Sequence, residues 1–169
     1  MLRNIKTDLL IRKAQNKEPE AFTELIQMYM QDMYRTAVAI LMNDEDAADA
    51  IQDTILSCWE KMDTLQYTKY FKTWMTKILI HKCLDIRKKQ EKIIPMEDYE
   101  EPVVEDAYNI ELKEALETLG EKYRLIMMLY YGEGYRVQEI ADFLGIPAST
   151  VQTRLDRGRK KLREYYQSD

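Results

Sequence analysis

The chain has 169 residues, of which 46% are hydrophobic and 33% are charged, with only 5 glycines and 4 prolines. This composition favours an all-α protein, and the length allows one domain or two small ones, each with its own hydrophobic core. The sequence contains no run of 18 apolar residues and begins without the apolar core of a secretory signal, which predicts a cytoplasmic protein that does not span a membrane.

Two helices are expected within the first forty residues. Residues 6–16 predict a short helix, and Pro19 is typical of the first position of a second one. From Phe22 to Leu41 apolar residues recur at helical spacing for about five turns, with Tyr34 among them. This stripe predicts a principal element of the core.

A third helix is predicted from Asp46 to Met62, capped by Asn43 or Asp44. Its inward positions are expected to be Ala47, Ala48, Ile51, Ile55, Cys58 (or Trp59) and Met62. Acidic residues in a first helical turn interact favourably with the helix dipole, so the early ones need no functional explanation. The outward residues Gln52 and Asp53 stand in mid-helix, and they indicate a surface that faces a partner.

Residues 63–70 are expected to form a loop that carries Tyr67 and Tyr70, followed by a helix over residues 71–90 with a basic second half. Cations near a helix C-terminus also interact favourably with the dipole, which gives these charges a purely structural explanation. The exposed tyrosines beside these charges favour a functional explanation as well. Aromatic rings stack on unpaired bases while lysines follow the phosphates, as in single-strand binding.

The next segment, residues 91–109, contains two prolines and little periodicity, and is predicted to be an acidic linker. Helices over residues 110–119 and 121–131 should follow. The chain is therefore expected to comprise two all-helical modules, residues 1–90 and 110–169, joined by that linker.

Residues 136–163 have the pattern of a helix-turn-helix. The first helix has Val137, Ile140, Ala141 and Leu144 at helical spacing and should end at Gly145, since glycine readily takes the left-handed conformation that closes a helix. Ser149 or Thr150 is expected to cap the second helix after Pro147. This helix should pack through Val151, Leu155, Gly158 and Leu162.

The outer surface of the second helix is strongly basic. Between residues 152 and 163 it carries Asp156 as its only acid, with Arg154, Arg157, Arg159, Lys160, Lys161 and Arg163 as basic residues. Such a run is often only a solvated face. In a chain with a net charge of −5, however, its concentration on one helix favours a recognition helix that enters a DNA major groove.

Catalytic and metal-binding motifs are not found in the sequence. Cys58 and Cys83 have no paired spacing, His81 is the single histidine, and there is no Gly-rich phosphate loop. We therefore expect a binding protein with no enzymatic activity, no cofactor and no metal.

These segments resemble the sigma-70 superfamily of bacterial transcription initiation factors, specifically its extracytoplasmic-function (ECF) group. Residues 46–62 are similar to region 2.2 through Gln52, Asp53 and Trp59, and residues 70–89 to regions 2.3 and 2.4 through Phe71, Trp74, Ile78, Asp85, Lys88 and Lys89. The second module resembles region 4 through Leu116, Leu119, Arg124, Glu139 to Ala141, Leu144 to Pro147, Thr150, Val151, Arg154, Leu155 and Arg157.

The resemblance implies three binding surfaces and a mechanism. The clamp helices of the RNA polymerase beta-prime subunit would bind Asp49, Gln52 and Asp53. The minus-10 element would be opened and held by Tyr67, Lys69, Tyr70, Phe71, Lys72, Trp74, Lys77, His81, Lys88 and Lys89. The minus-35 duplex would be read by Arg136, Ser149, Thr150, Gln152, Thr153, Arg154, Asp156, Arg157 and Lys160. It also implies control by an anti-sigma factor, commonly anchored to a membrane, and a stress or cell-envelope regulon.

Three positions depart from the family pattern. The family often has Asn where His81 stands, favours Gly where Ser149 stands, and often has Lys or Arg where Gln152 stands. Because glutamine pairs with the adenine edge and arginine with guanine, Gln152 is expected to shift the preference at its base pair towards adenine. The tail from Arg159 to Arg163 is expected to add mainly phosphate affinity.

Two other functions fit the sequence. The first is a stand-alone helix-turn-helix regulator in which the first module dimerises. The second is an adaptor that binds no DNA and would tolerate charge reversal of Arg154 and Arg157. A dimerisation module, however, has no need of exposed tyrosines followed by lysines.

Overall fold

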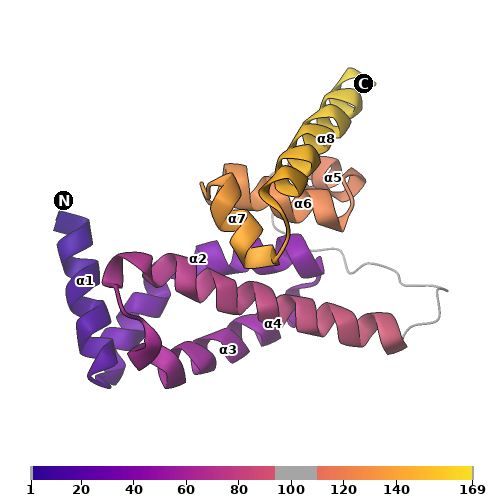
Figure 1. The fold of residues 1–169 in the computed structure, drawn as a ribbon. Coiled ribbons are helices and arrows are strands. Elements are labelled where there is room, and N and C mark those ends of the chain that lie inside the picture. Colours follow the sequence, from indigo (N-terminus) through magenta and orange to yellow (C-terminus); the bar gives the residue numbers. More distant parts are fainter. Residues whose placement is uncertain (1, 94–109, 169) are drawn as a thin grey trace. The chain divides into compact units, whose positions relative to one another are not determined.

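The computed structural model describes residues 2–93 and 110–168, and the side chains of residues 4–90 and 114–168. Regular structure in these ranges is entirely helical, which confirms the predicted all-α class (Figure 1). The chain divides into two compact units, Met1–Glu97 and Asp98–Asp169. Most of the predicted acidic linker, residues 94–109, lies outside the described residues.

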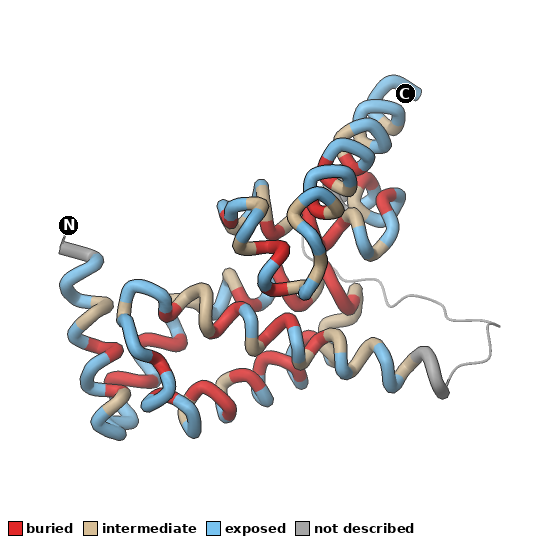
Figure 2. Tube along the Cα trace, viewed as in Figure 1, coloured by how far each residue is buried: buried red, intermediate tan, exposed pale blue. Residues whose placement is uncertain are grey.

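The first unit is a bundle of four helices: α1 (Leu2–Gln15), α2 (Pro19–Leu41), α3 (Asp44–Lys61) and α4 (Phe71–Ile93). Two short 3-10 turns, η1 (Met62–Thr64) and η2 (Thr68–Tyr70), connect α3 to α4. α2, α3 and α4 pack against one another, and α1 packs on α2 and on both turns. The inner faces of these helices are buried (Figure 2).

Local sequence signals set the helix boundaries in this unit. Pro19 starts α2 as predicted, and α2 ends at Met42, which takes a left-handed φ of 51°. The side chain of Asn43 accepts a hydrogen bond of 2.9 Å from the Asp46 amide, which confirms the predicted cap. α3 begins two residues earlier than predicted, because Asp44 and Glu45 already belong to its first turn.

Two predicted core positions in this unit are wrong. The buried face of α3 contains Ala50 and Thr54 together with Ala47 and Ile51, and Ala48 is exposed. Tyr34 is also exposed, and its hydroxyl donates to Asp44 Oδ1 at 2.7 Å. Periodicity identified the helices correctly, but the partner helices decide which flanking residue of a stripe points inward.

Both cysteines lie in the core of the first unit. Burial raises the pKa of Cys58 and of Cys83 to about 12, so both thiols stay protonated and unreactive at neutral pH. Both side chains therefore contribute to the packing of the core.

The second unit is built around α8 (Ala148–Gln167), on which α5 (Ile110–Thr118), α6 (Glu121–Met127) and α7 (Val137–Leu144) pack. α6 continues into a single π-helical turn, η3 (Met128–Gly132). α7 and α8 form the predicted helix-turn-helix. Gly145 closes α7 with a φ of 63° and donates its amide to Ala141 O, as its position predicts.

The start of α8 differs from the prediction. Pro147 is the N-cap and makes no side-chain cap bond, so Ser149 and Thr150 lie within the first helical turn instead of capping it. The hydroxyl groups of Ser149 and Thr150 therefore do not act as the N-cap of α8. In α7, Phe143 is buried against Tyr135, with ring centroids 4.9 Å apart, whereas the predicted core residue Leu144 is half-buried.

The close approach of α8 to α6 depends on Gly158. A Cβ at this position would lie 3.0 Å from Met127 Sδ and 3.8 Å from Tyr123 Cβ. We expect Gly158→Leu to lower the free energy of unfolding of this unit by about 1–3 kcal/mol, because the larger side chain overpacks the interface. Urea unfolding followed by circular dichroism measures this difference.

The matched control is Gly158→Ala. Its methyl group would meet the flexible end of Met127, and alanine favours a helix by about 1 kcal/mol over glycine, so its net effect should stay within about 1 kcal/mol. Equal stability of the leucine variant and the parent chain would contradict the close packing of α6 on α8.

Candidate nucleic-acid interface

The outward face of α8 carries the predicted recognition residues on consecutive turns. Gln152, Thr153, Asp156 and Arg157 are exposed, and Arg154 is half-buried. Arg136 stands apart from this row, as the N-cap of α7, where its amide donates to Glu139 Oε2 at 2.8 Å. The first turns of a helix with this exposure can enter a major groove and contact base edges.

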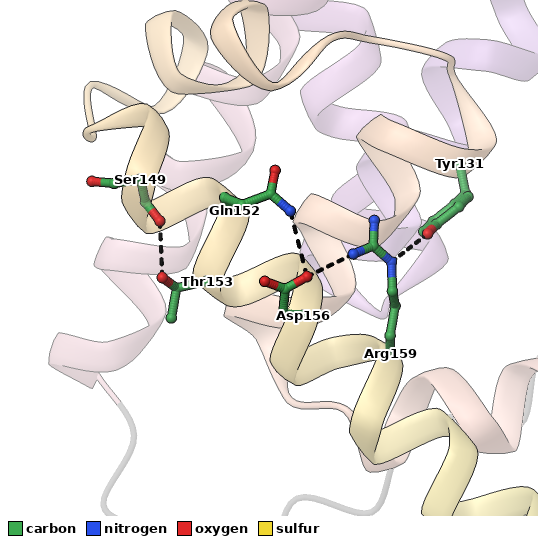
Figure 3. A network of polar contacts seen from close by, with 6 residues as sticks. All are labelled: Tyr131, Ser149, Gln152, Thr153, Asp156 and Arg159. Carbon is green, nitrogen blue, oxygen red and sulfur yellow. Dashed lines mark hydrogen bonds and ion pairs between the residues drawn. The ribbon is translucent and has the colours of Figure 1, made fainter.

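A chain of polar contacts crosses this face (Figure 3). Arg159 donates from Nε to the Tyr131 hydroxyl at 2.5 Å and from Nη1 to Asp156 Oδ1 at 2.7 Å. The same carboxylate oxygen accepts from Gln152 Nε2 at 3.4 Å. The hydrogen bond with Tyr131 and the charge of Asp156 raise the pKa of Arg159, against a smaller opposing effect of desolvation.

A cleft of about 290 Å³ lies between α6 and the start of α8. Its lining contains three cations and four hydroxyl groups, and no carboxylate. The lining residues are Lys122, Tyr123, Ser149, Thr150, Thr153, Arg154 and Arg157. A set composed of donors and positive charge is suited to a phosphate group.

The pKa of the Tyr123 phenol reflects the positive charges that line this cleft. Desolvation alone would raise the pKa of its phenol, but the hydrogen bond with Arg157 and the charge of Lys122 outweigh it and lower the pKa. Sequence reasoning missed Lys122 and Tyr123, because only the packing of α6 on α8 brings them to the recognition helix.

In the first unit, Tyr67 and Tyr70 project from the turn before α4. Their side chains are 61% and 50% exposed, and the rings meet edge to face with centroids 6.1 Å apart. The Lys69 ammonium lies 4.8 Å from the centroid of the Tyr70 ring. Two exposed rings beside a cation form a platform on which unpaired bases can stack.

The structure corrects the prediction that Phe71 contacts DNA. Its side chain is only 1% exposed and packs against Tyr29, with ring centroids 5.4 Å apart. Trp74 is half-buried beside it, with ring centroids 5.9 Å apart. Phe71 therefore belongs to the core at the start of α4, where it packs against α2.

The DNA-binding residues predicted on α4 continue from this platform along the helix. Lys77, His81 and Lys88 are exposed and follow the helical period, so they share one side, and Lys89 is exposed next to them. Beside the platform a second cleft of about 510 Å³ opens between α1, α2 and η2. Thr68, Lys69 and Lys72 line it, and the Lys72 ammonium lies 3.5 Å from Asp32 Oδ2.

A separate polar face lies on α3. The predicted partner residues Asp49, Gln52 and Asp53 are all exposed. Leu56 follows them at helical spacing and is 57% exposed. Sequence reasoning missed Leu56, although its position outside the buried stripe of α3 could have identified it. An apolar side chain among acidic neighbours is a suitable anchor for a protein partner.

The described residues include no group of histidine, cysteine, aspartate and glutamate that could hold a metal ion. No helix among them is long and apolar enough to cross a membrane.

These features define a two-module helical protein with a helix-turn-helix in one unit and a separate aromatic and basic surface in the other. Family models match both modules: "Sigma-70 region 2" matches residues 25–93, and "Sigma-70, region 4" matches residues 109–162. The RNA polymerase sigma factor SigV of Bacillus subtilis is 34% identical over 140 residues, which cover 80% of this chain and 84% of SigV.

A second relative agrees with these matches, and a solved structure shares the fold. The ECF RNA polymerase sigma factor SigW of Bacillus subtilis is 25% identical over 91% of this chain and 93% of its own length. The sigma factor RpoE, solved with the anti-sigma factor NepR from Bartonella quintana, superimposes with a TM-score of 0.71 at 20% identity, covering 88% of this chain and 98% of that one.

The chain belongs to the sigma-70 family and is an ECF RNA polymerase sigma factor. Its regions 2 and 4 bind core polymerase and promoter DNA, and it directs promoter-specific initiation of transcription.

Proposed function

We propose that the two modules form a two-point promoter clamp on core polymerase. Region 2, residues 1–90, would bind core and open the minus-10 element, and region 4, residues 110–169, would read the minus-35 duplex. Residues 91–109 would connect them as an acidic tether through the nucleic-acid channels of the polymerase. The observation that supports this proposal is that one chain presents two different surfaces suited to nucleic acid, an exposed tyrosine pair in one unit and the basic helix α8 in the other.

In region 2 the platform would receive unstacked bases while the cations of α4 hold the phosphates. Unstacking a base costs a few kcal/mol, so rings already exposed and oriented by packing lower the barrier to opening. The residues we assign to this role are Tyr67, Lys69, Tyr70, Lys72, Trp74, Lys77, His81, Lys88 and Lys89.

In region 4 the outer face of α8 would contact base edges and the cleft beside it would hold a phosphate. Gln152, Thr153 and Asp156 are the candidates for base contacts. Phosphate contacts would come from Ser149, Thr150, Arg154, Arg157, Lys160, Lys122 and Tyr123. Arg136, the N-cap of α7, would contact the DNA backbone.

The face of α3 would bind the clamp helices of the beta-prime subunit through Asp49, Gln52 and Asp53, with Leu56 as an apolar anchor. We further propose that an anti-sigma factor, anchored to the membrane, covers these surfaces until a stress or envelope signal releases the chain. The place of action is then the bacterial cytoplasm, where polymerase meets the chromosome. Binding alone accounts for this function, without catalysis by the chain.

Transcription of fragmented chromosomal DNA by purified core polymerase, with and without the chain, tests the proposal. We expect new start sites that appear only when the chain is present and that share two sequence blocks at a constant spacing. A chain that binds a minus-35 duplex but leaves the start sites of core polymerase unchanged would be a stand-alone regulator instead. Charge reversal of Arg154 and Arg157 should abolish the new starts, and unaltered starts would favour an adaptor that binds no DNA.

A further inference from the structure

Tyr131, Asp156 and Arg159 join the recognition helix to the turn that precedes the helix-turn-helix. Gln152, Asp156 and Arg159 are spaced by four and three residues along α8, so they follow one side of the helix. Tyr131 comes from η3 and meets Arg159 across 28 positions of sequence. The contacts run without a gap from Tyr131 to Gln152 (Figure 3).

Arg159 directs two of its donors towards side chains of its own unit. Its Nε and Nη1 groups contact Tyr131 and Asp156 at the same time, and its guanidinium carbon lies 5.6 Å from the Tyr131 ring centroid. Arginine has a rigid planar fork, which suits it to hold two partners in fixed directions. The phosphate role expected for this residue from the basic tail is therefore not the one that its contacts favour.

Asp156 links Arg159 to Gln152, because one of its carboxylate oxygens accepts hydrogen bonds from both side chains. An exposed carboxylate on a surface that approaches DNA would repel phosphates, and the adjacent guanidinium offsets that charge. Because the Gln152 amide nitrogen donates to Asp156, its oxygen points away from the carboxylate (Figure 3). The amide then has a defined orientation, with an acceptor presented outward.

We propose that Tyr131 and Arg159 form a brace that acts through Asp156 to fix the orientation of the Gln152 amide, which makes Arg159 a positioning residue for base recognition. In the major groove, an outward acceptor pairs with the exocyclic amine of adenine or cytosine, whereas guanine presents only acceptors on that edge. The brace would therefore select against guanine as the base that Gln152 contacts. This inference rests on the proposed reading of the minus-35 duplex by α8.

The test compares Tyr131→Phe with the parent chain as holoenzyme on a pool of promoters randomised in the minus-35 element. Tyr131→Phe removes the acceptor of Arg159 Nε and changes no charge. We expect the preference for adenine or cytosine over guanine at the contacted base to fall roughly fivefold, since a good base contact contributes discrimination of this order or more. The dependence of affinity on salt should not change, since no phosphate contact is lost.

Tyr166→Phe is the matched control, because Tyr166 is an exposed tyrosine on α8 that lies outside the brace. Arg159→Gln separates the two possible roles of Arg159. A brace predicts loss of base preference, whereas a phosphate contact predicts uniformly weaker binding and a salt slope smaller by about one, with preference intact. The second result would overturn the proposal.

A double-mutant cycle adds an independent readout. If Arg159 acts through Gln152, Arg159→Gln should leave base preference unchanged in a Gln152→Ala background. Equal losses in both backgrounds would contradict the brace. Start-site selection by core polymerase is measured in parallel. If the parent chain gives no promoter-specific starts, the sigma function itself is refuted, independently of the brace.

Discussion

Leu56→Glu is expected to lower the affinity of the chain for core polymerase by about 30-fold or more while the fold stays intact. Truncation or reversal of a central apolar anchor in a protein interface typically costs at least about 2 kcal/mol, which corresponds to that ratio. Leu56 is 57% exposed and stands next to Gln52 and Asp53, so glutamate disturbs no core packing but adds a charge where an apolar contact is needed. Equilibrium binding of labelled chain to purified core measures the change.

The control for this experiment is Leu9→Glu. Leu9 is similarly exposed, at 53%, but lies on α1, away from the polar face of α3. We expect its affinity for core to match that of the parent chain. Equal binding by the Leu56 variant and the parent chain would show that polymerase uses another face of region 2.

The double variant Tyr67→Ala with Tyr70→Ala is expected to lose promoter opening but keep core binding and minus-35 binding. Stacking of a base on an aromatic ring contributes about 1–3 kcal/mol, so the loss of two rings should reduce open complexes by roughly 30-fold or more. Both residues are exposed and neither belongs to the buried core, so their removal should leave the fold of the unit intact. Run-off transcription from a mapped promoter measures the loss.

Tyr166→Ala is the corresponding control, since Tyr166 is 49% exposed and lies on α8, outside region 2. It should initiate like the parent chain. If the double variant opens promoters normally, the bases are not held by this platform, and the cleft lined by Lys69 and Lys72 becomes the better candidate.

The positions and ends of the helices could be predicted from the sequence, because the signals that set helix ends are local. Pro19, Asn43 and Gly145 mark helix ends by their own backbone and capping chemistry, and each acts as predicted. The outward position of Asp49, Gln52 and Asp53 followed from the helical period alone.

Features that depend on packing between distant segments were not predictable in the same way. Phe71 and Trp74 are neighbouring aromatic residues at the start of one helix, and only the position of Tyr29 on α2 decides that Phe71 is the buried one. The phosphate cleft needs Lys122 and Tyr123 from α6, which no local pattern connects to α8. The contact between Tyr131 and Arg159 likewise depends on the π-helical turn that ends α6.

Permanganate reactivity of promoter thymines tests the two-point clamp most directly. On a promoter mapped with the holoenzyme, we expect thymines of the minus-10 element to become reactive only when core polymerase and the chain are both present. This reactivity should disappear with the Tyr67 and Tyr70 double variant, which still protects the minus-35 duplex. Protection of the minus-35 duplex by the parent chain and core, without any reactive thymine at minus-10, would contradict the account.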